Sequence, residues 1–123
     1  MTVGEPLPPW SPGVLDIHQI STGRGNAALL VFPDGTSLLV DAGDGNPEPP
    51  RGANRVPDGS RSAGEWIARY ARRMLSHQTD PVIDYGLITH FHGDHMGGLG
   101  PATPAEVGGE YQLSGFTDVA SHT

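Results

Sequence analysis

No cysteine occurs in the 123-residue chain, and charged residues make up only 17% of it. Without cysteine the protein has no disulfide framework and no thiolate ligand, so any metal site must use nitrogen and oxygen donors. The low charged fraction is accompanied by 18 glycines and 12 prolines, which indicates a large share of loop. The length allows one domain at most.

Long apolar runs are also missing. The longest, residues 27–32, is far too short to cross a bilayer, and the N-terminus has neither a basic patch nor a hydrophobic signal core. These features predict a soluble, cytoplasmic protein that does not enter membranes. The formal net charge of −7 disfavours nonspecific binding to nucleic acid, because such binding depends on Lys and Arg neutralising phosphates.

Apolar periodicity predicts four strands, at residues 14–20, 27–32, 36–41 and 82–89. The turn between the second and third, Pro33-Asp34-Gly35, is typical of a hairpin. Because these two runs are almost continuously apolar, we expect both faces of the sheet to be covered.

One main helix is predicted over residues 62–77. Ser62 and Glu65 have the spacing of a capping box, in which the hydroxyl and the carboxylate satisfy amides of the first turn, and an apolar stripe follows them. The order of strand, hairpin, helix and strand is that of an α/β fold. Outside these elements we expect an extended proline-rich arm, a long loop and an irregular tail, at residues 1–13, 46–61 and 100–123 respectively.

The densest chemical signal lies where the last predicted strand ends. Four residues of metal-ligand type fall within six positions there: His90, His92, Asp94 and His95. Imidazole nitrogen and carboxylate oxygen together suit zinc, with manganese or iron as substitutes. The spacing therefore predicts a metal site.

The local chain geometry indicates how such a site forms. Alternate side chains of an extended segment face the same way, so His90 and His92 can approach one ion while Phe91 turns toward the interior of the protein. The glycines at positions 93, 97 and 98 are expected to let the chain bend sharply, which brings Asp94 and His95 to a second ion.

The order His-x-His-x-Asp-His, followed by Met96-Gly97-Gly98-Leu99, resembles the signature of the metallo-β-lactamase superfamily of metal-dependent hydrolases. Segments upstream look like the branch that includes the hydrolase domain of bacterial DNA-uptake channels, namely Leu15-Asp16-Ile17-His18, Phe32-Pro33-Asp34-Gly35 and Leu39-Val40-Asp41-Ala42-Gly43-Asp44-Gly45. The resemblance implies that residues 14–123 are the N-terminal half of an α/β/β/α sandwich, mostly one sheet with one main helix.

The resemblance also implies roles for individual residues. His90 and His92 would hold one ion of a binuclear zinc site, and Asp94 and His95 the other. A metal-bound hydroxide, oriented by Asp94, would attack an ester, phosphodiester or lactam bond in a small-molecule or phosphodiester substrate. Asp41 would hold a ligand histidine in one tautomer; the competing interpretation is an ordinary turn residue.

Other candidate ligands are expected to lie outside the site: His18, Asp44, His77, Asp84 and His122. Because only His122 remains downstream to complete the ligand set, the alternative function is that of a truncated, non-catalytic metal-binding fragment. A half-sandwich would leave an apolar sheet face uncovered, which predicts a homodimer or poor solubility.

Overall fold

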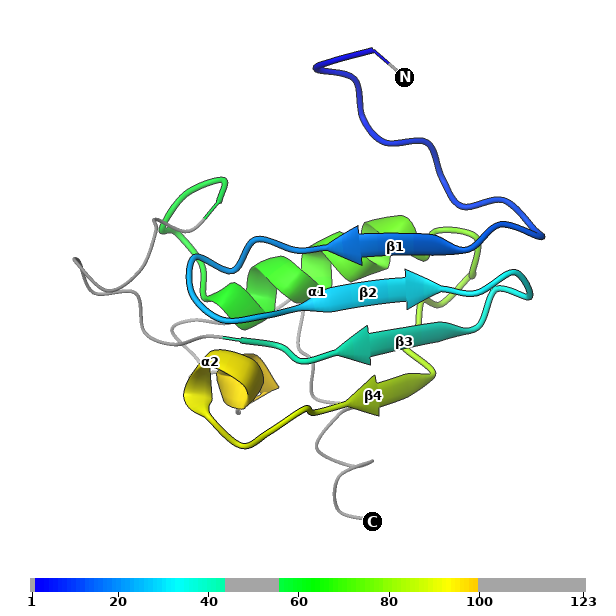
Figure 1. Cartoon of the computed structure of the whole chain (residues 1–123). Helices are drawn as coiled ribbons and strands as arrows, with labels where there is room; N and C mark the ends of the chain where they lie inside the picture. The colour runs from blue at the N-terminus through cyan, green and yellow to red at the C-terminus, as the bar shows by residue number, and fades with distance from the viewer. Residues whose placement is uncertain (1, 44–55, 100–123) are drawn as a thin grey trace.

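A computed structural model describes residues 2–43 and 56–99, in which a four-stranded mixed sheet carries one long helix on one face (Figure 1). The elements in chain order are the strands β1 (Asp16–Gln19), β2 (Ala28–Val31) and β3 (Ser37–Val40), the helix α1 (Ala63–Met74), the strand β4 (Tyr85–Leu87), the short helix α2 (Gly93–Met96) and the 3-10 turn η1 (Gly97–Leu99).

The sheet has the order β1-β2-β3-β4. The first three strands pair antiparallel, and β4 pairs parallel with β3 after the crossover through α1. A tight turn joins β2 to β3, with hydrogen bonds from Phe32 N–H to Thr36 O and from Gly35 N–H to Phe32 O, both 2.8 Å long. Gly35 has a φ of +88°, which favours glycine. The predicted hairpin is therefore present.

The core lies between the sheet and α1. Alternate residues of β2 and β3 point toward the helix and are buried there with its apolar stripe. The largest fully buried apolar side chains are Leu29, Val31, Leu39, Ile67 and Leu75.

The expectation that both sheet faces are covered is wrong for the described residues. On the face away from α1, Ile17, Leu30, Leu38 and Tyr85 form a row across the four strands. Ile17 is 65% exposed and Tyr85 63% exposed, whereas Leu30 and Leu38 are half-buried by their neighbours. The nearly continuous apolar runs of β2 and β3 therefore give the sheet an apolar outer face, and no second layer made of the described residues packs on it.

Helix α1 begins where the sequence predicts. Ser62 is the N-cap, and its Oγ accepts a hydrogen bond from Glu65 N–H at 3.2 Å. The second half of the expected capping box is not formed, because the Glu65 carboxylate pairs with Arg61 instead. The helix ends at Met74, three residues earlier than predicted, and Leu75 N–H closes the last turn on Ala71 O at 2.8 Å.

The predicted strand 82–89 contracts to the three residues of β4, all exposed. It is an edge strand that pairs only with β3, so one of its edges and one of its faces lack cover from the described chain. The expectation that Phe91 faces the interior is also wrong, since this side chain is 84% exposed. The chain leaves the strand at Leu87, and the alternation of an extended segment no longer governs the residues beyond it.

The described part of the N-terminal arm, residues 2–13, contains neither helix nor strand. Trp10 joins it to the body: its Nε1–H donates to Val14 O at 2.7 Å, and its ring lies 4.6 Å from the ring of His77. The predicted tail at 100–123 and most of the predicted loop at 46–61 fall outside the described residues. Among those described, no helix has the length and hydropathy needed to cross a membrane.

Candidate metal centre

The segment after β4 is tied to the sheet through its main chain. Asp41 N–H donates to Leu87 O at 2.8 Å, and Ala42 N–H donates to His95 O at 2.7 Å. The β1–β2 connection adds a hydrogen bond from Asn26 N–H to Asp94 O at 3.0 Å. Backbone contacts with two separate segments therefore fix where the side chains of α2 lie.

Glycines permit this close approach. A Cβ at Gly25 or Gly43 would overlap the carbonyl oxygen of Asp94, and a Cβ at Gly64 would overlap that of Gly98. A Cβ at Gly98 would lie 2.8 Å from Ala42 O. These positions need glycine because the backbones touch there.

The expected bend at glycines 93, 97 and 98 arises differently from the prediction. Gly97 has an ordinary helical φ of −61°, and the chain turns through the single helical turn of α2. A Cβ added at Gly93 would meet no atom within 4 Å. The turn therefore does not depend on left-handed glycine conformations at these positions.

Three of the four predicted ligands come together at this turn. His90, Asp94 and His95 each present a ligand atom, and these atoms lie within 4.8 Å of one another. Nε2 of His95 is 3.9 Å from Oδ2 of Asp94, and the rings of His90 and His95 are 3.8 Å apart between centroids. Two ligand atoms on one tetrahedral zinc are roughly 3.3 Å apart, so small side-chain adjustments would suffice for coordination.

His92 lies beside this group but is not one of the three. It is the N-cap residue of α2, its side chain is exposed, and its ring is 4.8 Å from that of His90 between centroids. The geometry places His90 with Asp94 and His95, so the division of the four residues into two pairs on two ions stays a prediction.

Asp41 is the buried anion beneath the cluster. It is 1% exposed, follows the end of β3 and has a φ of +57°, which is uncommon for a residue other than glycine. Oδ1 accepts Thr89 N–H at 2.8 Å, and Oδ2 accepts the Thr89 hydroxyl, His95 Nδ1–H and Asn26 Nδ2–H at 2.8, 2.7 and 3.2 Å.

These contacts determine the charge of Asp41 and the tautomer of His95. Burial raises the pKa of Asp41, but the hydrogen bonds from His95, Thr89 and Asn26 outweigh it and lower the pKa to about 2. An ionised carboxylate can only accept a hydrogen bond, so Nδ1 of His95 carries the hydrogen, and Nε2 is the nitrogen with a lone pair in the neutral ring. That nitrogen faces Asp94.

Sequence reasoning gave no role to Thr89 or Asn26, and both contact Asp41. Thr89 had a detectable signal, since it precedes His90 in the motif and its hydroxyl also lies 3.2 Å from His90 Nδ1. Asn26 lies in a glycine-rich turn 15 residues before Asp41, and no local pattern connects the two.

The remaining candidates have other surroundings. His18 bonds Tyr70 through Nδ1 at 2.9 Å, and His77 contacts Gly35 O at 3.3 Å. Asp84 accepts hydrogen bonds from the backbone and hydroxyl of Ser37. Asp44 and His122 lie outside the described residues.

Comparison with known proteins yields two findings. A family model described as the metallo-beta-lactamase superfamily matches residues 21–106. The lactamase-like protein vrtG of Penicillium aethiopicum is 27% identical over 89 residues, which cover 72% of this chain and 21% of that protein. The chain thus spans about a fifth of the length of the curated relative that it matches. No solved structure matches it.

Proposed function

This chain belongs to the metallo-beta-lactamase superfamily, and from that premise we propose that it functions as a metal-dependent hydrolase. The observation that supports this most directly is the convergence of His90, Asp94 and His95 above the ionised carboxylate of Asp41. The proposed ligand set is His90, His92, Asp94 and His95, and the proposed cofactor is zinc, as two ions, with manganese or iron as substitutes.

The donor atoms fit a cation of this kind. The three grouped ligands are two imidazoles and a carboxylate, all exposed or half-exposed, so an ion and a substrate can reach them from solvent. When bound, such an ion lowers the pKa of its coordinated water toward 7 and supplies a hydroxide for attack on an ester, phosphodiester or lactam bond.

The residues of the chain have distinct proposed tasks. Asp94 offers one carboxylate oxygen to the cation, and its second oxygen is placed to orient the nucleophile. Asp41 keeps Nδ1 of His95 protonated and Nε2 available as a ligand. Thr89 holds Asp41 through both its amide and its hydroxyl.

The substrate proposal combines two opposing indications. The resemblance to the DNA-uptake branch favours a phosphodiester, whereas the net charge of −7 opposes long polyanions through repulsion. We propose a small substrate with one hydrolysable bond over a nucleic acid polymer.

Metal content and hydrolysis test the proposal together. We expect purified chain, saturated with zinc and desalted, to retain metal by mass spectrometry and to hydrolyse at least one of bis(p-nitrophenyl) phosphate, p-nitrophenyl acetate and nitrocefin. His92→Ala and Asp94→Ala should lower both readings, while His77→Ala, a histidine substitution away from the cluster, should lower neither. Undiminished turnover in Asp94→Ala would rule out the proposed role of that carboxylate.

A second candidate is a non-catalytic metal-binding fragment. It is favoured because the described residues supply a group of three ligand donors, which is enough for one ion and incomplete for two. Metal retention that depends on His90 and His95, with no turnover of any of the three substrates, would support this function over the enzyme.

The open sheet face supports a further part of the proposal, a homodimer. The row of Ile17, Leu30, Leu38 and Tyr85 would be covered by the same row of a second copy. Light scattering after gel filtration should give twice the chain mass for the parent protein and the single-chain mass for Ile17→Lys. A monodisperse monomer at all concentrations would exclude the dimer.

A further inference from the structure

A cavity lies away from the metal-ligand cluster, between the β1–β2 connection and α1. Its volume is about 510 Å³, and its lining comes from three segments of the chain: Gln19, Ile20 and Ser21, then Val56 and Pro57, then Trp66, Arg69, Tyr70 and Arg73. None of these residues belongs to the proposed metal site. Cavities of this size suit small organic molecules.

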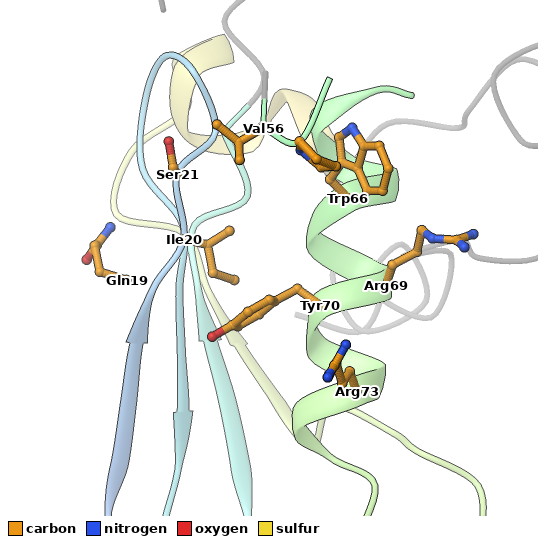
Figure 2. Close-up of a pocket in the computed structure, with 9 residues that line it drawn as sticks. Gln19, Ile20, Ser21, Val56, Trp66, Arg69, Tyr70 and Arg73 are labelled. Atoms are coloured by element: carbon orange, nitrogen blue, oxygen red, sulfur yellow. The ribbon is translucent and has the colours of Figure 1, made fainter. Parts of the chain in front are cut away.

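One part of the lining is apolar and aromatic. Figure 2 shows Ile20 and Tyr70 facing one another across the gap, with Val56 and Trp66 toward one end of it. The indole Nε1–H of Trp66 donates to Asp58 O at 3.2 Å, and the hydroxyl of Tyr70 bonds Nδ1 of His18 at 2.9 Å. Because both rings are held by hydrogen bonds outside the cavity, their faces form a fixed apolar wall.

The other part of the lining is cationic. Arg69 and Arg73 lie one turn apart on α1 and both line the cavity, whereas none of its lining residues is acidic. Cζ of Arg69 is 6.0 Å from the Trp66 ring centroid, which places this charge near the aromatic wall. The chain as a whole has 14 acidic residues against 7 basic ones, so two adjacent arginines at one cavity are a local reversal of charge.

We propose that this cavity binds a small organic anion, a planar aromatic ring that carries one carboxylate. The ring would lie against Trp66, Tyr70 and Ile20, and the carboxylate would pair with the guanidinium of Arg73. Figure 2 shows the Arg69 side chain directed away from Ile20 and Tyr70, so Arg69 would join this pair through a change of rotamer. A guanidinium binds a carboxylate through two parallel hydrogen bonds, which gives direction as well as charge complementarity. The net charge of −7 favours a single charge on the ligand, because a phosphate dianion would meet about twice the repulsion.

Fluorescence of Trp66 gives a direct test with 2-naphthoate as the probe. The chain has two tryptophans, so Trp10→Phe leaves Trp66 as the sole reporter. EDTA is present throughout, so that a metal ion does not contribute to carboxylate binding. We expect a saturable change in emission with a dissociation constant in the millimolar range or tighter, and binding at least about tenfold weaker for the uncharged analogue 2-naphthalenemethanol.

Charge substitutions separate a local site from the general field of the protein. Arg73→Gln and Arg69→Gln should each weaken 2-naphthoate binding about tenfold or more, with little effect on 2-naphthalenemethanol. Arg72→Gln is the matched control, since it removes the same charge from the same helix at an exposed residue that does not line the cavity. It should change the affinity less than twofold.

A filled cavity provides the last test. Ile20→Trp adds bulk where Ile20 faces Tyr70, and it should abolish binding, with circular dichroism confirming that the variant is folded. Equal weakening by Arg72→Gln and Arg73→Gln, equal affinity for the charged and uncharged ligands, or the absence of saturation in the parent protein would each overturn the proposal. His90→Ala should leave binding unchanged, so failure of the metal proposal would not affect this one.

Discussion

Replacement of Asp41 by asparagine tests whether one buried carboxylate organises residues 88–96, the ligand loop that carries the proposed metal ligands. Asparagine has nearly the same shape and tolerates the φ of +57° at this position, so the backbone adds little cost. The amide nitrogen, however, would face donors that now point at a carboxylate oxygen: the Thr89 hydroxyl, the Asn26 amide and His95 Nδ1–H. At least one of these donors would lose its acceptor.

The size of the effect follows from the pKa of Asp41. Its displacement from 3.8 to about 2 corresponds to about 2 kcal/mol of stabilisation, at about 1.4 kcal/mol for each pKa unit. We therefore expect Asp41→Asn to lower the free energy of unfolding by about 2–3 kcal/mol, because a donor left without an acceptor adds to this loss. Urea denaturation in EDTA at pH 7 measures it without a contribution from metal.

The sign of the pH dependence is an independent check. The pKa of Asp41 is lower in the folded state, so its stabilisation is complete above about pH 4 and is lost as the pH falls toward 2. The stability gap between the parent protein and Asp41→Asn should narrow over that interval. Zinc affinity should fall about 10- to 100-fold in the variant, since His95 would lose the acceptor that fixes its tautomer. Stability within about 0.5 kcal/mol of the parent, together with unchanged zinc affinity, would refute this reasoning.

Five further substitutions have expected outcomes that thermal or urea unfolding can measure. Gly43→Ala should prevent the ligand loop from docking and lower the free energy of unfolding by about 3 kcal/mol or more, because its Cβ would overlap the Asp94 carbonyl. Gly93→Ala should be near neutral, since its Cβ would meet no atom within 4 Å. Ser62→Ala should lower the free energy of unfolding by about 1 kcal/mol, because α1 loses its N-cap hydrogen bond. An unchanged free energy of unfolding, followed by the helical circular dichroism signal, would contradict the stabilising role of this cap. Leu29→Ala should lower the free energy of unfolding by about 3 kcal/mol because Leu29 is fully buried. Leu87→Ala should lower it by less than about 1 kcal/mol because Leu87 is 51% exposed. Similar losses of stability at both positions would argue against the sheet face assigned to the core.

Local chemistry made part of the structure predictable. The Pro33-Asp34-Gly35 turn, the Ser62 cap and the apolar stripe of α1 are short-range signals, and each specifies an element within about a dozen residues. The metal motif is similarly local, since His90, Asp94 and His95 meet over a single helical turn. Such short sequence patterns predict which neighbouring side chains come together in the folded protein.

Two of the wrong predictions are local, the carboxylate half of the capping box and the bend at the glycines, and the others concern how distant segments pack. Hydrophobic strands indicate burial without stating how many layers cover them, so the exposure of β4 and of Phe91 was missed. The contacts of Asp41 with Asn26 and Thr89 span 15 and 48 positions; no pattern points to Asn26, and Thr89 is marked only by its place before His90 in the motif. The glycines at 25, 43 and 98 are needed for close backbone approach, which only the folded arrangement reveals.

The parallel pairing of β4 with β3 has a consequence for the order of events during synthesis. The carboxylate at position 41 leaves the ribosome long before its partners Thr89 and His95, because α1 and β4 lie between them in the chain. A nascent chain that has emerged only as far as α1 therefore carries none of the four proposed metal ligands, and the proposed site could not hold a metal ion at that stage. Loading of the proposed metal site would then be a late step that follows completion of this sheet.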